Sequence, residues 1–320
     1  MSEGALAFGE PLMHHHKGGS VQGIFNIVPT PFDETGAIDE ASLARLIEFV
    51  IGTGVDGLTI LGFLGEAGKL TEAERATVID VSVATAAGRV PVVVGATAPA
   101  TDPGVAFARD AVGRGAAGLL VAPPRLARPN EAAVRRHYQT LADAVDVPIV
   151  VQDFPAGSGV FMSPEFIGGL AAAIPSCRWL KLEDDPTIQK VTAILAVNPD
   201  IGIFGGLGGN FMLEELQRGA IGMMTGFGFP EILVSIWRHF SAGELEQARD
   251  TFYRYLPLIR YENQPGLNLP LRKLIYQQRG AIDHAAPRRP YPPLDEVTLS
   301  ELDALLERLG LTTPGPVSIE

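Results

Sequence analysis

One lysine of this sequence stands in a setting where a lysine can do chemistry. Lys181 lies in the segment Trp179-Leu180-Lys181-Leu182-Glu183. In a β-strand this alternation places Trp179, Lys181 and Glu183 on one face and both leucines on the other. Burial of an ammonium group lowers its pKa, which leaves more neutral amine to attack a ketone. The segment therefore predicts either a lysine that forms an imine (Schiff base) or a lysine that only pairs with Glu183.

Three further candidates stand where other strand-like segments end. In Gly62-Phe63-Leu64-Gly65-Glu66 the glycines allow exposed backbone amides that suit a carboxylate, and Glu66 can support the loop from below. Gln152 and Asp153 offer hydrogen-bonding groups, and the glycines around Gly206, at residues 205–209, leave room or backbone donors for a ligand. The glycine-rich segments can equally be simple turns, and Asp153 can equally cap a loop.

The elements that must position these residues alternate between short β-branched runs and longer segments with helical spacing of apolar residues. Because strand ends carry the reactive groups of a (β/α)8 barrel, the candidates fit that fold. Eight strands are expected, at Ile24–Val28, Gly57–Leu61, Pro91–Ala96, Gly118–Ala122, Pro148–Gln152, Arg178–Leu182, Ile201–Phe204 and Ile221–Thr225. Eight parallel strands with right-handed crossovers favour an α/β TIM barrel over a doubly wound open sheet.

Helix signals between the strands agree with this fold. Thr71 and Glu74 have the spacing of a capping box, and Ser163 precedes a proline at a helix start. Beyond the last strand, residues 244–260, 269–279 and 299–309 are expected to form added helices. The expected organisation is a flexible arm (1–20), the barrel (21–242), a helical extension packed on it (243–311) and a tail (312–320).

Composition excludes several classes of function. The net charge of −12 gives no basic surface for nucleic acid, and no apolar run is long enough to span a membrane. The single cysteine, Cys177, excludes an internal disulfide, and no secretory signal opens the chain, so a cytoplasmic location is expected. His14 to His16 can bind a metal or be the remnant of a tag, but a loose arm is the favoured interpretation.

Three features together resemble the dihydrodipicolinate synthase and N-acetylneuraminate lyase family. They are Val28-Pro29-Thr30-Pro31-Phe32, the Gly-x-x-Gly-Glu loop at residues 62–66, and Lys181 on the sixth strand. The resemblance covers residues 23–309. It implies a (β/α)8 barrel in a homotetramer or homodimer, an imine on Lys181, and the loop near the carboxylate of a small-molecule 2-keto acid.

Departures from the synthase pattern point to another branch of this family. Phe63 and Leu64 stand where the synthase has hydroxyl residues, and Gln152 stands where it has a tyrosine, so lysine-pathway synthase activity is not expected. The chain is more similar to the branch that contains L-2-keto-3-deoxyarabonate dehydratase. The matching segments are residues 151–156, 181–183, 224–226, 256–259, 262–263, 286–288 and 292–293.

The resemblance implies a lyase that dehydrates a 2-keto-3-deoxy sugar acid. Lys181, Glu183 and Gln152 are the expected catalytic residues, with Glu183 as the acid or base. Gly62, Phe63, Leu64, Gly65, Asp153, Gly206, Met224 and Thr225 are expected to bind substrate, with Glu66 as structural support. No metal or other cofactor is expected, because the imine supplies the electron sink. The alternatives are a pyruvate-dependent aldolase or synthase, a deaminase, and a barrel that only binds a metabolite.

Overall fold

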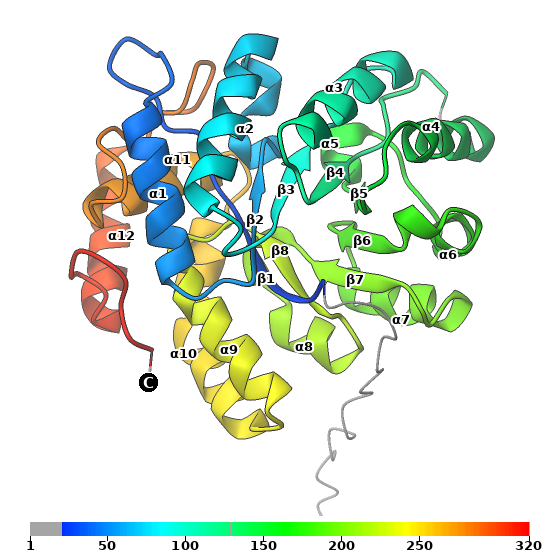
Figure 1. Cartoon of the computed structure of the whole chain (residues 1–320). Helices are drawn as coiled ribbons and strands as arrows, with labels where there is room; N and C mark the ends of the chain where they lie inside the picture. The colour runs from blue at the N-terminus through cyan, green and yellow to red at the C-terminus, as the bar shows by residue number, and fades with distance from the viewer. Residues whose placement is uncertain (1–20, 129, 320) are drawn as a thin grey trace, which may run out of the picture.

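The computed structural model describes residues 21–128 and 130–319. Its centre is a closed barrel of eight parallel strands in sequence order, with β8 paired to β1 (Figure 1). This closure confirms the predicted (β/α)8 barrel and excludes the open sheet. The strands are β1 (Gly23–Ile27), β2 (Gly57–Ile60), β3 (Val92–Gly95), β4 (Gly118–Val121), β5 (Ile149–Asp153), β6 (Trp179–Leu182), β7 (Gly202–Gly205) and β8 (Gly222–Thr225). The arm expected at residues 1–20, with His14 to His16, lies outside the described residues.

Helices surround the barrel and cover the outer face of its strands (Figure 1). They are α1 (Glu40–Gly52), α2 (Glu72–Ala86), α3 (Thr101–Gly113), α4 (Glu131–Ala144), α5 (Pro155–Ser158), α6 (Pro164–Ala173), α7 (Thr187–Val197), α8 (Met212–Gln217) and α9 (Pro230–Ser241). Short 3-10 turns η1 (Phe63–Gly65), η2 (Ala67–Lys69), η3 (Pro175–Cys177) and η4 (Leu207–Gly209) lie between some of them. The longer helices, such as α1 and α4, bury one apolar stripe against the strands, which is what the 3.6-residue spacing predicts.

Two of the helix starts follow the predicted capping. The side chain of Thr71 accepts a hydrogen bond from the Glu74 backbone, and the Glu74 carboxylate accepts one from the Thr71 backbone. Ser163 caps α6 by accepting from the backbone N–H of Phe166, ahead of a proline at the first helical position. Such caps satisfy donors that the first helical turn leaves free.

Two separate apolar clusters show which side chains face into the barrel. The inner cluster contains Phe25, Val93, Leu120, Val150, Phe204, Ile221 and Met224, with Trp179 packed against it. Leu180 and Leu182 belong instead to the large outer cluster between strands and helices. The alternation of β6 therefore directs Lys181 inward, as the sequence predicts.

Three more helices follow the barrel: α10 (Leu245–Glu262), α11 (Asn268–Gln278) and α12 (Glu296–Leu309). They begin and end close to the predicted positions, although α12 starts three residues earlier because Asp295 caps it. Figure 1 draws α11 close to α1, and α12 contacts α10. The Phe49 and Tyr276 ring centroids are 6.0 Å apart between α1 and α11, so the extension packs on the barrel's helices. None of the described helices has the length and hydropathy that crossing a membrane requires.

Candidate active site

Lys181 occupies the third position of β6, inside the barrel and near the end where the strands finish. The residue is only 2% exposed. Its neighbours in the register are Gln152 on β5 and Phe204 on β7. The C-terminal end of the strands is where (β/α)8 barrels carry reactive groups, so Lys181 is correctly placed for the predicted chemistry.

One carboxylate oxygen connects the three residues that the sequence predicts as catalytic. Lys181 Nζ lies 3.0 Å from Glu183 Oε2. Gln152 Nε2 donates a hydrogen bond of 2.7 Å to the same oxygen. The amide of Gln152 therefore holds a carboxylate against the amine, where it can accept or return a proton.

Burial sets the protonation of the lysine. Desolvation lowers the pKa of Lys181, the charge of Glu183 opposes this effect, and the nearby positive charge of Arg272 adds to the lowering. A lowered pKa increases the fraction of neutral amine near neutral pH, and only that form attacks a carbonyl carbon. The setting therefore favours imine formation.

A cavity of about 240 Å³ opens at this end of the barrel. Gly62, Phe63, Glu66 and Gln152 are among its lining residues, whereas Leu64 and Gly65 are not. The Phe63 ring packs against Phe154 with centroids 5.3 Å apart, which joins the loop after β2 to the loop after β5. Part of the predicted substrate loop thus borders a cavity next to Gln152.

Glu66 supports this loop through contacts with the C-terminal part of the chain. The residue is 2% exposed and has the left-handed backbone φ of 58°. Its carboxylate accepts hydrogen bonds from Lys273 Nζ at 2.6 Å, Lys69 Nζ at 3.0 Å and the Arg288 backbone N–H at 2.9 Å. These three donors compensate the burial of the carboxylate and fix the end of the loop.

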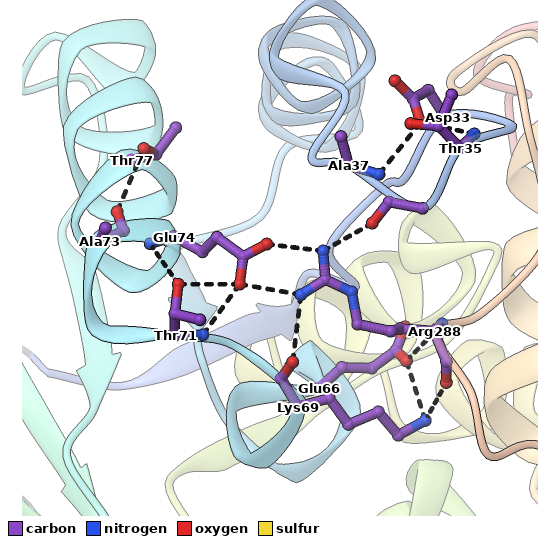
Figure 2. A network of polar contacts seen from close by, with 11 residues as sticks. Asp33, Thr35, Ala37, Glu66, Lys69, Thr71, Ala73, Glu74, Thr77 and Arg288 are labelled. Atoms are coloured by element: carbon purple, nitrogen blue, oxygen red, sulfur yellow. Dashed lines mark hydrogen bonds and ion pairs between the residues drawn. The ribbon is translucent and has the colours of Figure 1, made fainter.

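Figure 2 shows how the same network continues through Arg288. Its guanidinium binds the Glu74 carboxylate with two contacts of 2.9 and 2.7 Å, and it donates to the backbone carbonyls of Lys69 and Gly36. Hydrogen bonding to Arg288 lowers the pKa of Glu74 to about 2. The segment after α11 therefore ties the loop after β2 to the start of α2.

Gly206 brings the second glycine-rich segment to the site. A Cβ atom at this position would lie 2.3 Å from Cγ of Glu183, so the backbone of Gly206 packs directly against the Glu183 side chain. Thr225 accepts a hydrogen bond of 2.9 Å from the Gly208 backbone N–H, which fixes the same segment. Met224 lies in the inner cluster of the barrel.

Asp153 does not join the other predicted residues. Its neighbours on β5 show why: Val150 and Gln152 face inward, and Val151 and Asp153 face the helices. Asp153 Oδ2 lies 2.6 Å from Lys190 Nζ of α7, while burial raises the pKa of this carboxyl to about 6 against the opposing charge of Lys190. The structure thus gives Asp153 a contact with a helix in place of a contact with the cavity.

Sequence reasoning missed the charged residues that α11 contributes. Arg272 and Lys273 are 1% and 0% exposed. The sequence held a signal of this burial. The spacing of Arg272, Ile275, Tyr276 and Arg279 places them on one face of a helix. Because the aromatic and aliphatic residues of that face are buried, its arginines are buried as well. In residues 21–128 and 130–319, no group of three or more His, Cys, Asp or Glu side chains is arranged to hold a metal ion.

Comparison with known proteins decides the family. The sequence model that describes the dihydrodipicolinate synthetase family matches residues 20–309 of this chain. The chain belongs to this family. The L-2-keto-3-deoxyarabonate dehydratase of Azospirillum brasilense is 34% identical over 293 residues, which are 90% of this chain and 94% of that protein. The 4-hydroxy-tetrahydrodipicolinate synthase of Salinibacter ruber is 32% identical over 281 residues, 86% of this chain and 91% of that protein.

Solved structures of dihydrodipicolinate synthetase family members share the fold. A dihydrodipicolinate synthase from Rhodopseudomonas palustris has a TM-score of 0.84 and 36% identity, and the match covers 90% of this chain and 97% of that one. A monomeric dihydrodipicolinate synthase variant has a TM-score of 0.84 and 26% identity over 91% of this chain and 97% of that one. The predicted family, the barrel and the assignment as a lyase of this family are confirmed.

Proposed function

We propose that this lyase dehydrates a 2-keto-3-deoxy sugar acid through an imine on Lys181. The observation that carries the proposal is the buried contact of 3.0 Å between Lys181 Nζ and Glu183 Oε2, with Gln152 bound to the same oxygen. A nucleophilic amine and a proton-transfer group stand side by side at the mouth of the barrel. The similarity to a 2-keto-3-deoxyarabonate dehydratase supports the choice of substrate class.

The proposed reaction uses the amine as the electron sink. Neutral Lys181 attacks the C2 ketone, water leaves, and the resulting iminium acidifies the protons on C3. Removal of one C3 proton gives an enamine, whose electrons expel the C4 hydroxyl as water after it has received a proton. The unsaturated imine then tautomerises, and hydrolysis releases the keto acid product and the free amine of Lys181.

Glu183 is the proposed acid and base in these steps, and Gln152 is the residue that orients it. The backbone of Gly206 packs against the Glu183 side chain and limits the space available to it. We propose that the loop from Gly62 to Gly65 borders the substrate, with Gly62 and Phe63 lining the cavity and Leu64 and Gly65 completing the turn behind them. Thr225 and Met224 act indirectly, because one fixes the loop at Gly208 and the other packs in the barrel interior.

The second candidate is a pyruvate-dependent aldolase or synthase, because similarity to 4-hydroxy-tetrahydrodipicolinate synthases also extends over most of the chain. The same imine supports cleavage between C3 and C4. The two reactions have different products: cleavage releases pyruvate, whereas dehydration keeps the carbon skeleton.

Reduction of the imine tests the proposal directly. The protein is incubated with borohydride and either pyruvate or a 2-keto-3-deoxypentonate, and the adduct is measured by intact mass and peptide mapping. We expect a reduced adduct on Lys181 with both compounds, and the sugar acid adduct shows by its mass whether water or a carbon fragment has left. Adducts on other lysines only, or no adduct with either compound, would contradict the imine mechanism.

A homotetramer or homodimer is part of the proposal, although the monomeric variant noted above shows that this fold can exist without partners. Light scattering after size-exclusion chromatography measures the assembly. A mass equal to one chain would contradict this part of the proposal and leave the imine mechanism unaffected.

A further inference from the structure

Glu183, the proposed acid and base, lies just beyond the end of β6. Residues 183–186 form the loop that joins β6 to α7. A loop has fewer fixed backbone contacts than a strand, so a reactive side chain on a loop needs further contacts that restrict it. This loop must therefore be held in place if the carboxylate is to stay within reach of the amine.

The backbone of Glu183 is held by β5. Its N–H donates a hydrogen bond of 2.9 Å to the carbonyl of Asp153. This bond continues the pairing of β5 with β6 one residue beyond Leu182, where β6 ends. Asp153 thus fixes the point at which the loop begins, although its side chain faces the helices.

The next residue of the loop is held by α7. Lys190 lies in the first turns of this helix, and its backbone N–H donates to the carbonyl of Pro186 at 3.2 Å. Lys190 Nζ lies 2.7 Å from Asp184 Oδ2 and 2.6 Å from Asp153 Oδ2. One ammonium group therefore ties the residue after Glu183 to the residue that binds the Glu183 backbone.

This bridge places charges where an apolar contact would fill the space. The Asp153 side chain is buried, and its Oδ1 has no hydrogen-bond partner in the part of the chain that the structure describes. Val151, on the same side of β5, packs there as an apolar residue. A buried ion pair adds little net stability, because desolvation offsets the attraction, but it can define the relative position of the groups that it joins.

We infer that Lys190 is a positioning residue for Glu183. By joining Asp153 to Asp184, it fixes the loop on both sides of the carboxylate. This inference rests on the proposed function, in which Glu183 moves protons during elimination. Attack on the ketone uses the amine of Lys181, whereas elimination also requires the carboxylate at the correct place. A loosened loop should therefore slow elimination more than imine formation.

Removal of the Asp184 side chain tests this role without leaving a buried charge unpaired. Asp184→Ala breaks one arm of the bridge and leaves Lys190 paired with Asp153, and Asp184 is 20% exposed, so the fold should tolerate the change. The kcat for dehydration of a 2-keto-3-deoxypentonate and the borohydride trapping of pyruvate on Lys181 are both measured. We expect kcat to fall by about 10-fold and the half-saturating pyruvate concentration to stay within about 2-fold of the wild-type value.

Asp185→Ala is the matched control. Asp185 lies in the same loop and carries the same charge, but its exposed side chain makes no hydrogen bond or ion pair within residues 21–128 and 130–319. Its kcat should equal that of the wild-type protein.

A second variant removes the bridge from its other end. Lys190→Met/Asp153→Asn takes away the ammonium and the buried negative charge together, and it keeps the backbone carbonyl that accepts from Glu183. We expect the same fall in kcat, again with pyruvate trapping retained.

The outcomes distinguish the inference from the proposed function. Wild-type kcat in either bridge variant would show that the bridge does not position Glu183. Equal losses in Asp184→Ala and Asp185→Ala would assign the effect to the charge of the loop, and a loss of trapping in parallel with kcat would assign it to the fold. Each of these results overturns the inference and leaves the imine mechanism standing. A wild-type protein that forms no adduct on Lys181 and dehydrates no sugar acid would overturn the proposed function and the inference with it.

Discussion

At the scale of single residues, Glu183 Oε2 lies within hydrogen-bond distance of two different groups, an amine and an amide. Lys181 and Gln152 both contact this oxygen, at 3.0 and 2.7 Å. The amide can only donate from its nitrogen, so it keeps the oxygen in place and takes no part in proton transfer. The carboxylate is thus the group next to the amine that can move a proton during elimination.

Replacement of this carboxylate should separate imine formation from turnover. Glu183 raises the pKa of Lys181, so Glu183→Gln lowers that pKa further and more neutral amine is present at lower pH. We expect the pH profile of pyruvate trapping to move to lower pH, while dehydration of the sugar acid falls by about 100-fold or more. Borohydride trapping over a pH series and a product assay measure the two effects.

Two results would argue against this role of Glu183. Full turnover in Glu183→Gln would show that another group moves the proton. A trapping profile displaced to higher pH would show that the Glu183 charge does not act on Lys181 as the structure indicates.

At the scale of elements, the loops after the strands determine how much freedom the reactive side chains have. The loop after β7 approaches Glu183 at Gly206, and the hydroxyl of Thr225 at the end of β8 fixes this loop through Gly208. The position of Glu183 therefore depends on the ends of β7 and β8 in addition to β6, the strand that it follows.

A single methyl group at Gly206 should disturb the site without unfolding the barrel. In Gly206→Ala the new Cβ would lie 2.3 Å from Glu183 Cγ, so the Glu183 side chain must move. A displacement of about 1 Å at a reacting group can cost 100-fold in rate, and we expect a loss of that order in kcat with normal circular dichroism.

Gly52→Ala is the control for this substitution. A Cβ atom at position 52 would meet no heavy atom within 4 Å apart from its own helix backbone and chain neighbours, and the position ends α1, far along the chain from the reactive groups. The activity of this variant should equal that of the wild-type protein. Equal activity of Gly206→Ala would show that the contact with Glu183 does not position the carboxylate.

At the scale of the whole molecule, the helices after the barrel form part of its catalytic end. The helix α11 contributes Lys273, which contacts Glu66 below the loop after β2, and Arg272, which packs on Gly226 after β8. These two contacts lie on either side of β1 in the barrel order. The extension therefore connects the loop after β2 to the end of β8.

Loss of the Lys273 contact should destabilise the molecule strongly. Burial lowers the pKa of Lys273 to about 8, while the charge of Glu66 opposes this effect. In Lys273→Met the buried Glu66 carboxylate keeps only Lys69 and the Arg288 backbone N–H as donors. We expect the free energy of unfolding to fall by about 3 kcal/mol, measured by urea denaturation.

Arg45→Met is the matched comparison. Like Lys273, Arg45 forms an ion pair between the barrel part and the C-terminal part of the chain, here from α1 to Asp283. Its pair with Asp283 has side chains 41% and 62% exposed. Solvent screens such a pair, so its loss should change the urea midpoint far less than Lys273→Met does. Similar midpoints for the two variants would contradict a special contribution of the buried contact.

The sequence by itself determined the order of the elements and the orientation of the central lysine. Alternation in residues 179–183 follows from strand geometry, so the inward direction of Lys181 and its nearness to Glu183 are local properties. The same rule places Gln152 and Asp153 on opposite faces of β5. The prediction that both residues border the site did not take this alternation into account.

Only the tertiary structure decided which distant residues complete the site. Glu66 and Lys273 are 207 positions apart, and Arg272 is also remote from Gly226 in the sequence. Contacts of this kind depend on where α11 crosses the end of the closed barrel, and helical periodicity predicts which face is buried but not what that face meets. The sequence therefore predicted the candidate lysine, and the packing of the C-terminal helices decided which charged groups lie at the same end of the barrel.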